Sequence, residues 1–475
     1  MTKPVKTRFA PSPTGMLHIG GARTALFSKL YAKHTGGEYV VRIEDTDRER
    51  STQAAVDAIK DGLNWLDLGP DNGQYVFQTS LVEKHTEAAH QMLKNGTAYK
   101  CFVAPEELDA MRKEAEERGE MPKYDGRHRD LTPEQIDDLE AKGVPFAVRI
   151  KLPLDGSTVW EDAVQGRIEI ANTQLDDFVL LRSDGTPTYN LAVVVDDAEM
   201  DITHVIRGDD HINNTPKQIH IYEALGLDVP TFAHLPLIHG KDGKKLSKRT
   251  GSVDVMHYKD MGYLPASLNN YLMRLGWGMG DKEVISFNEA VEAFELTDVN
   301  KGASIFDFDK LDWLNGEYIK QMNNNDLFAS VKPFFELDGT PLSEAAADRI
   351  SKLMDALKPR ARRLTDFVDV AQFCLFDGRP GLADAKAEEV LSAGMEHVNG
   401  LADALDMQDD WSEASLDGVV KTYIKESGAK FPAVGMPVRV ALTGTTQAPS
   451  VGAILSALGK EESLKRLGHN IEMER

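Results

Sequence analysis

Residues 7–44 read TRFAPSPTGMLHIGGARTALFSKLYAKHTGGEYVVRIE, and their pattern predicts a strand, a turn, a helix and a second strand. Residues 7–10 form the first strand, which ends in a segment rich in Pro, Ser and Gly. Apolar residues recur at helical spacing from 22 to 31, and Gly36 and Gly37 end that helix. Alternating side chains at 39–43 indicate the second strand. This order of elements implies an α/β fold with a doubly wound parallel sheet.

The pattern changes along the rest of the chain. Ser51 is a plausible N-cap for a second helix. Residues 80–190 mix a charged helix with short strands and are typical of an insertion within the first fold. Strand signals then return in three segments, 191–195 (LAVVV), 204–206 and 235–238. Beyond about residue 255 the chain is expected to be mostly helical.

The composition excludes several classes of protein. The chain has 475 residues, enough for roughly three domains. We expect a protein of the cytoplasm, since the sequence shows neither an apolar run of membrane-helix length nor an apolar leader. Its two cysteines are too few for a disulfide scaffold and fit a reducing compartment.

The charge balance limits how this chain could bind nucleic acid. Lys and Arg number 54, Asp and Glu number 76, and the net charge is −22. So acidic a chain must contact any polyanion through local basic patches. Two windows, 241–249 and 352–363, each hold five basic residues and one acidic residue. A solvated basic surface is the alternative explanation for both windows.

Two motifs carry the chemistry. The first, residues 8–21 (RFAPSPTGMLHIGG), joins a strand end and a rigid turn to a glycine-rich helix start, where free N–H groups and the helix dipole favour phosphate. His18 adds a donor there, although a helix-capping histidine is the alternative. The second, residues 244–251 (KKLSKRTG), is a basic loop after a predicted strand, and such a loop can close over a polyphosphate.

Together the two motifs resemble the signature pair of class I aminoacyl-tRNA synthetases, specifically the bacterial glutamyl-tRNA synthetases. HIGG at 18–21 is similar to the HIGH signature with Gly21 as its last residue, and KLSKR at 245–249 is similar to KMSKS. Further stretches that match in family order are VRIEDTDR at 41–48, TPTYN at 186–190 and VIRGDDH at 205–211. The resemblance spans the chain and becomes looser after residue 325.

The resemblance implies roles for individual residues. Arg8 and Arg207 are suited to the two carboxylates of glutamate, because a guanidinium binds a carboxylate bidentately. Glu44 is the expected partner of the α-ammonium. The full set expected to bind glutamate is Arg8, Ser12, Glu44, Tyr189 and Arg207. The set expected to bind ATP is Pro11, Ser12, Gly15, His18, Gly20, Gly21, Lys245, Leu246, Ser247, Lys248 and Arg249, with His18, Lys245 and Lys248 catalytic.

The resemblance also implies substrates and partners. These are ATP with Mg²⁺, L-glutamate and tRNA(Glu), and the protein is expected to be a monomer without a membrane partner. Whether tRNA(Gln) is charged as well stays open, because enzymes of both kinds share the catalytic motifs. Lys358 and Arg360 are candidate anticodon contacts, and Arg360 matches an arginine that disfavours glutamine anticodons in some members. The alternative is a basic patch that steers tRNA without specificity.

The resemblance further implies a Rossmann-like catalytic fold with an inserted α+β acceptor-binding domain and a mostly α-helical anticodon-binding region. The expected parts are the first catalytic half at 1–80, the insertion at 81–190, the second catalytic half at 191–255, a stem-contact region at 256–325 and the anticodon-binding region at 326–475.

One family feature is missing from the insertion. Some bacterial members bind zinc there through three cysteines and a histidine. The matching positions in this sequence are Cys101, Val103, His128 and Asp130, and valine cannot ligate a metal. Because structural zinc needs four ligands, mostly Cys and His, we predict no zinc in this chain and no residues of its own that bind a metal.

Two other functions compete with tRNA charging. One is glutamyl transfer onto a modified tRNA base by a related family, whose members resemble a chain that ends before the anticodon-reading part. The roughly 200 residues after 275 argue against it. The other is nucleotide or RNA binding without catalysis, which the presence of His18, Arg207 and Lys248 disfavours.

Overall fold

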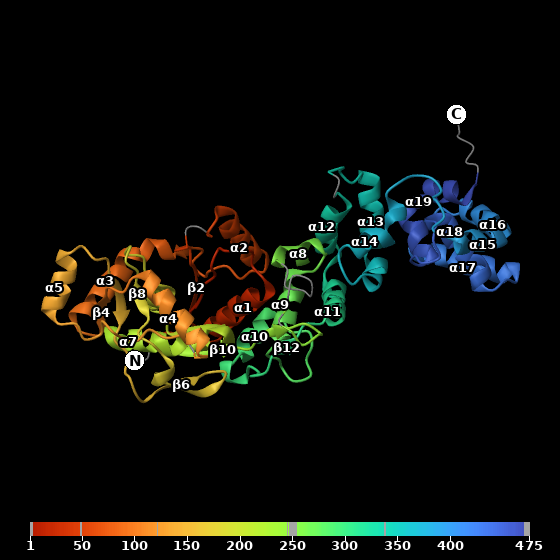
Figure 1. Cartoon of the computed structure of the whole chain (residues 1–475). Helices are drawn as coiled ribbons and strands as arrows, with labels where there is room; N and C mark the ends of the chain where they lie inside the picture. The colour runs from red at the N-terminus through yellow and green to blue at the C-terminus, as the bar shows by residue number, and fades with distance from the viewer. Residues whose placement is uncertain are drawn as a thin grey trace. The chain divides into compact units, whose positions relative to one another are not determined.

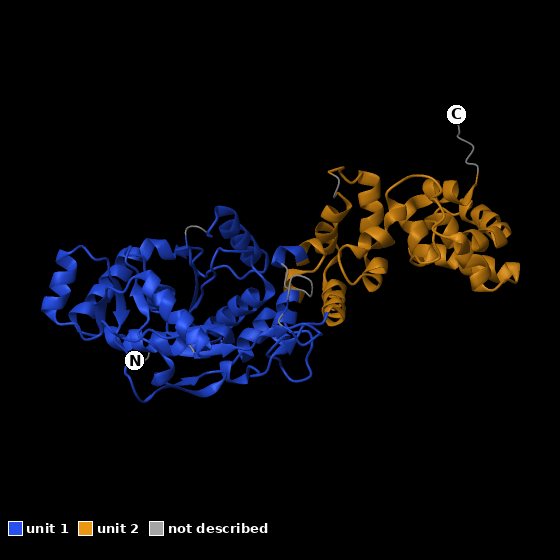
Figure 2. Ribbon diagram, viewed as in Figure 1, with its two compact units in different colours: residues 1–257, 268–307 blue, residues 258–267, 308–475 orange. Residues whose placement is uncertain are grey.

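The structure is a computed structural model that describes residues 3–47, 50–120, 122–244, 246, 254–336 and 339–469. The chain divides into two compact units (Figure 2). Unit 1 consists of residues 1–257 and 268–307, and unit 2 consists of residues 258–267 and 308–475. The finer division into five parts stays a prediction.

A parallel five-stranded sheet lies at the centre of unit 1 (Figure 1). In spatial order its strands are β10 (Thr231–Leu235), β9 (His204–Gly208), β1 (Lys6–Phe9), β2 (Glu38–Ile43) and β3 (Tyr75–Phe77). All neighbouring strands are parallel. The strand order reverses between β1 and β9, and ligands of such sheets bind beyond the carboxyl ends of the strands at this point. The predicted doubly wound sheet is confirmed.

Helices cover both faces of this sheet. On one face, α3 (Val82–Lys94), α6 (Tyr189–Glu199) and α7 (Thr215–Leu225) share a buried core with Val40, Val205 and Phe232 of the strands. On the other face, α1 (Ile19–His34) packs on β1, β2 and β9 and against α10 (Phe287–Ala293). This three-layer arrangement leaves the carboxyl ends of the strands for a site.

The segment 191–195, predicted as a strand, is helical instead. It belongs to α6, in which every residue from Leu191 to Asp197 is buried. A short apolar run does not distinguish a buried strand from a helix enclosed on all sides. The prediction for 204–206 is confirmed by β9, whereas the strand predicted at 235–238 is divided between β10 and the short β11 (Ile238–His239).

The helix after β2 has a different N-cap from the predicted one. Thr52 caps α2 (Gln53–Trp65), since its Oγ1 accepts a hydrogen bond from the Ala55 N–H at 3.2 Å. The predicted Ser51 lies one residue earlier. The apolar face of the helix, with Val56 and Leu63, is buried as expected.

The inserted segment contains its own antiparallel strands. β4 (Ala98–Cys101), β5 (Ala147–Ile150) and β8 (Val179–Leu181) form one sheet, and β6 (Ser157–Asp162) pairs with β7 (Gly166–Ala171) as a hairpin. The helices of this segment are α4 (Pro105–Glu117) and α5 (Pro133–Ala141). Thr132 begins α5 with a capping box. The α+β character of the insertion is therefore confirmed.

Short elements complete unit 1 and lead into unit 2. They are η1 (Gln78–Leu81), η2 (Asn172–Gln174), η3 (Asp209–Asn214), η4 (Leu296–Asp298), β12 (Ser304–Ile305), α8 (Val255–Asp260) and α9 (Pro265–Arg274). α8 and α9 lie in the region beyond about residue 255 that the sequence predicts to be mostly helical. β11 pairs with β12 in parallel.

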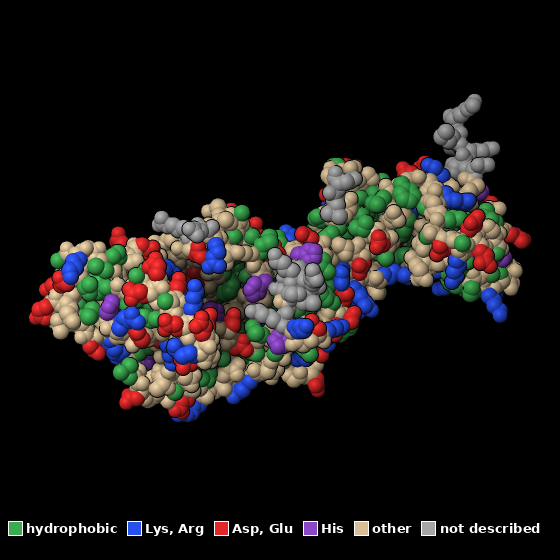
Figure 3. All heavy atoms as spheres, in the orientation of Figure 1, with side chains coloured by type: hydrophobic (Ala, Val, Ile, Leu, Met, Phe, Trp, Pro, Cys, Tyr) green, Lys and Arg blue, Asp and Glu red, His purple; other side chains and the backbone are tan. Residues whose placement is uncertain are grey.

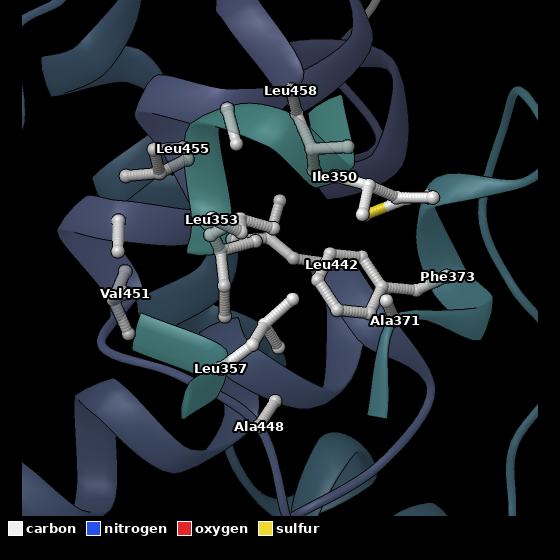
Figure 4. Close-up of a cluster of buried hydrophobic side chains, with 14 of the residues drawn as sticks. Ile350, Leu353, Leu357, Ala371, Phe373, Leu442, Ala448, Val451, Leu455 and Leu458 are labelled. Carbon is white, nitrogen blue, oxygen red and sulfur yellow. The ribbon is translucent and has the colours of Figure 1, made fainter. Parts of the chain in front are cut away.

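The described part of unit 2 is entirely helical outside its turns, which confirms the predicted class of this region. Its helices are α11 (Phe308–Gln321), α12 (Asn324–Phe335), α13 (Glu344–Leu357), η5 (Lys358–Arg360), α14 (Asp366–Val370), η6 (Gln372–Cys374), α15 (Ala385–Ala393), α16 (Met395–Asp406), α17 (Glu413–Ser427), α18 (Phe431–Thr443) and α19 (Val451–Leu467). Ile350 and Leu353 of α13 pack with Leu442 of α18 and Leu455 of α19 in one core (Figure 4). Among the described residues, the helices are all too short or too polar to cross a membrane.

Candidate active site

A cavity of about 640 Å³ opens beyond the carboxyl ends of β1, β2, β9 and β10. Its lining includes most residues that the sequence assigned to the site. They are Arg8, Pro11, Ser12, Gly15, His18, Gly20, Gly21, Glu44, Tyr189, Arg207 and Leu246. Lys245, Ser247, Lys248 and Arg249 lie outside the described residues. The structure therefore brings the two binding sets together at the switch point of the sheet.

The glycine-rich motif forms the start of α1 at one side of this cavity. His18 is the N-cap, and its Nδ1 accepts a hydrogen bond from the Gly21 N–H at 3.2 Å. A Cβ at Gly20 would lie 3.1 Å from the His18 ring, and one at Gly21 would lie 3.2 Å from Leu17. Glycine at both positions thus lets the histidine fold back over the helix start. His18 caps the helix and also lines the cavity.

Described residues on both sides of the stretch 247–253 lie near this motif or the cavity. Before it, the Leu246 N–H donates to the carbonyl of Ile238 at 3.4 Å, and Leu246 lines the cavity. After it, Asp254 forms a β-bridge with His18, and the Val255 N–H donates to the carbonyl of Leu17 at 2.8 Å. Among the described residues, Leu246 thus lies at the cavity and Asp254 lies beside His18.

Buried charges lie behind Arg8 and Glu44. Asp197 of α6 accepts hydrogen bonds from Arg8 Nε at 3.1 Å and from Arg42 Nη1 at 2.6 Å. Arg42 Nη2 also donates to Glu44 at 3.3 Å. All four side chains are buried. Asp197 was not among the predicted site residues, because its position beneath Arg8 and Arg42 follows from α6 being a helix packed under the strands.

The carboxylate of Glu44 is not fully compensated by these cations. Burial raises the pKa of Glu44 above its ordinary 4.5, and Arg42 and Arg8 only partly oppose that shift. A further cation near Glu44 would stabilise its charged form. The α-ammonium of an amino acid is a group of this kind.

Arg207 lines the cavity without a carboxylate partner among the described residues. Its guanidinium donates to Gln218 Oε1 and Thr215 Oγ1, each at 2.8 Å, and to His234 Nε2 at 3.2 Å. Burial lowers its pKa below the ordinary value of an arginine, but the guanidinium remains charged at neutral pH. A buried, unneutralised guanidinium favours an anionic ligand. Tyr189 lies nearby, with its hydroxyl 3.2 Å from His211 Nδ1.

The polar residues at the positions of the zinc ligands have partners within the protein. Cys101 Sγ lies 3.5 Å from the Tyr124 hydroxyl, and His128 Nδ1 accepts the Phe102 N–H at 3.0 Å. Asp130 pairs with Lys151 at 3.0 Å. Where the structure describes the chain, three or more His, Cys, Asp or Glu side chains do not cluster as metal ligands.

The insertion should fold without metal. Chelator treatment, followed by removal of the chelator and addition of Mg²⁺ for the assay, is expected to leave both the melting temperature and aminoacylation unchanged, because the positions of a closed four-ligand site include a valine. Elemental analysis and thermal melting before and after chelation measure this. Stoichiometric zinc that is lost together with activity would contradict the prediction.

The candidate anticodon residues follow α13 in unit 2. Lys358 is buried, and its Nζ donates to the carbonyl of Met322 at 2.6 Å. Arg360 is exposed, and its charge, together with burial, lowers the pKa of Arg439. Two cations therefore lie close together on a chain whose visible surface is rich in acidic side chains (Figure 3). Of the two candidates, Arg360 is the one with an available charge.

Comparison with known proteins agrees with these features. The model for class I tRNA synthetases (E and Q), catalytic domain, matches residues 4–313, and that for an anticodon binding domain matches residues 326–471. The fold and site thus define a class I aminoacyl-tRNA synthetase of the glutamate and glutamine group.

Relatives that match over nearly the whole of both chains show to which family within this class the chain belongs. Glutamate–tRNA ligase 1 of Methylobacterium radiotolerans is 50% identical, over 98% of this chain and 99% of that protein. Glutamate–tRNA ligase 2 of Brucella ovis is 49% identical, over 99% and 100%. The crystal structure of a glutamate tRNA ligase from Elizabethkingia meningosepticum in complex with its amino acid superposes with a TM-score of 0.88 at 32% identity, over 98% and 99%. The chain belongs to the glutamate–tRNA ligase family.

Proposed function

We propose that this protein activates L-glutamate with ATP and transfers it to the 2′-OH of the 3′-terminal adenosine of tRNA(Glu). The observation that carries the proposal is the single cavity lined by Arg8, Glu44 and Arg207 and by the glycine-rich start of α1. These groups match an amino acid with two carboxylates and one ammonium beside a phosphate. Membership in the glutamate–tRNA ligase family supports the same substrates.

Activation depends on positioning more than on covalent catalysis. The α-carboxylate oxygen attacks the α-phosphorus of ATP, the bond to the β-phosphate oxygen breaks, and pyrophosphate leaves. His18 and the N–H groups at the start of α1 would stabilise the triphosphate, as would Lys245 and Lys248 of the basic loop. Mg²⁺ that accompanies ATP would neutralise part of its charge.

Transfer completes the reaction. The 2′-OH of the terminal adenosine attacks the carbonyl carbon of glutamyl-adenylate, and the bond to the phosphate oxygen breaks. AMP leaves, and the hydroxyl proton passes to the phosphate or to water. The anticodon domain match at 326–471 supports charging of the tRNA 3′ end and argues against transfer onto a modified tRNA base by a chain that lacks this domain.

ATP–pyrophosphate exchange tests the proposal. The wild-type protein should exchange label only when both glutamate and tRNA are present, and it should then charge purified tRNA(Glu). Exchange that occurs with another amino acid and not with glutamate would show that glutamate is not the substrate. Binding of ATP and tRNA with neither exchange nor charging would favour a non-catalytic function.

We also infer a monomer that works in the cytoplasm. Both cysteines, Cys101 and Cys374, are buried free thiols, which suits a reducing compartment. Light scattering in solution would test the oligomeric state.

Arg360 is proposed to exclude glutamine anticodons. Its exposed guanidinium beside Arg439 can stack on or hydrogen-bond a splayed anticodon base. Arg360→Gln should therefore raise charging of tRNA(Gln) relative to tRNA(Glu), measured as the ratio of kcat/KM for the two purified tRNAs. The alternative is that Arg360 only attracts tRNA electrostatically. In that case charging of both tRNAs should fall equally, and the salt dependence of tRNA binding should decrease by about the equivalent of one phosphate contact.

A further inference from the structure

His234 and Asp162 form a buried pair directly behind Arg207. Asp162 ends β6 at the turn of the inserted hairpin, whereas His234 lies in β10 of the central sheet. Nδ1 of His234 lies 2.5 Å from Oδ2 of Asp162, and both side chains are fully buried. The His234 N–H also donates to Oδ1 of Asp162 at 3.1 Å. The insertion thereby supplies a carboxylate to a strand that borders the cavity.

The second nitrogen of the imidazole contacts Arg207. Arg207 Nε donates to His234 Nε2 at 3.2 Å, and Thr215 Oγ1 lies 3.1 Å from the same nitrogen. A guanidinium is only a donor, so Nε2 must be an unprotonated acceptor. The proton of the neutral ring then resides on Nδ1 and is donated to Asp162. The contacts with Asp162 and Arg207 therefore require one tautomer.

We propose that Asp162 and His234 are positioning residues for glutamate recognition: Asp162 fixes the tautomer of His234, and His234 holds the Arg207 guanidinium toward the cavity. This inference rests on the proposed function, which assigns Arg207 to a carboxylate of the substrate. A neutral imidazole between Asp162 and Arg207 orients the guanidinium without pairing it with a carboxylate. The positive charge of Arg207 thus remains available for the ligand.

The groups around His234 keep it neutral at ordinary pH. Burial lowers its pKa below the usual 6.5, the hydrogen bond to Asp162 opposes this shift, and the charge of Arg207 lowers the pKa further. Asp209 has a smaller opposing effect. His211 also faces this group, and burial together with Arg207 lowers its own pKa to about 4. Protonation of His234 at lower pH would place an N–H against the Arg207 Nε–H.

Asp162→Asn tests the tautomer. The asparagine NH₂ would face Nδ1, so the ring proton would move to Nε2 and oppose Arg207. The KM for glutamate, measured by ATP–pyrophosphate exchange with tRNA(Glu), should rise about 10- to 100-fold, as expected for loss of a hydrogen bond to a buried charge. The KM for ATP should stay within about twofold of the wild-type value, since this contact does not reach the glycine-rich motif.

Gln165→Ala is the matched control. The Gln165 side chain ties the same hairpin to the His234 carbonyl at 3.0 Å but does not contact the ring. If the KM for glutamate rises in this variant as much as in Asp162→Asn, loosening of the hairpin alone is enough to raise it. That result would overturn the proposal. An unchanged KM for glutamate in Asp162→Asn would overturn it as well. Absence of glutamate-dependent exchange in the wild type would instead refute the proposed function.

His234→Gln provides a readout that does not depend on the hairpin. The glutamine Oε1 can accept from Arg207 Nε in place of Nε2, yet it does not titrate. In the wild type, the affinity for glutamate should fall as the pH drops through the pKa of His234, which lies below the ordinary 6.5. In His234→Gln, this fall should be absent over the same pH range. An identical pH profile in both proteins would contradict the proposal.

Discussion

Lys248→Ala is expected to lower kcat about 10²–10³-fold and to change the KM for ATP much less. The expected magnitude is that of removing one electrostatic donor aimed at charge that grows in the transition state. Lys248 lies outside the described residues, and its role is inferred from the KLSKR motif. Leu246 lines the cavity and Asp254 pairs with His18, so the described residues on either side of Lys248 lie at or near the cavity. Single-turnover formation of glutamyl-adenylate measures the chemical step directly.

Lys241→Ala is the control for general charge loss near this loop. Lys241 lies in the same basic window, 241–249, but its ammonium pairs with Asp307 at 3.0 Å and is largely exposed. An exposed ion pair contributes little, so kcat in this variant should stay within about twofold. A Lys248→Ala protein with near-normal kcat and a raised KM for ATP would show that the lysine binds ATP without assisting the chemistry.

Local patterns predicted the elements that build the first half of the site. Strand β1, the cap at His18, helix α1 and strand β2 are each specified by turn residues, glycines and periodicity within a few positions. The order of these elements then places Arg8, His18 and Glu44 at one edge of a parallel sheet. The sequence therefore predicted that these three residues lie near one another without any information about long-range contacts.

Local sequence patterns did not predict features that depend on tertiary packing, such as the choice between strand and helix or a contact between distant residues. The LAVVV run at 191–195 suits a buried strand and a buried helix equally, and the neighbours of α6 determined the outcome. Because this segment was predicted as a strand, the ion pairs of Asp197 with Arg8 and Arg42 were not predicted. They form only when the segment is helical. Asp162 and His234 lie 72 positions apart, and their contact depends on how the inserted hairpin packs against β10. Periodicity carries no information about such a contact.

Asp197→Ala is expected to destabilise the protein by about 3–5 kcal/mol. Removing one partner from a buried ion cluster leaves uncompensated charge in a medium that solvates it poorly. Here Arg8 and Arg42 would both lose their hydrogen bonds to Asp197, and both are buried. The free energy of unfolding, taken from the urea transition in which aminoacylation is lost, measures this effect. Asp228→Ala is the control, because its pair with Lys3 is exposed and should not alter that free energy measurably.

The pH dependence of this loss distinguishes a charge effect from lost packing. Burial alone would raise the pKa of Asp197, but Arg42 and Arg8 hold it below the ordinary 3.8. A carboxylate with a lowered folded-state pKa stabilises the protein above its unfolded pKa, and that stability is lost as the pH falls through the folded pKa. The difference in stability between wild type and Asp197→Ala should therefore be complete at neutral pH and shrink below about pH 3.8. A difference that stays constant down to the acid transition would instead indicate a packing defect. Because Asp197 also orients Arg8, this variant should lose glutamate affinity and stability together, whereas Asp162→Asn should mainly lose affinity.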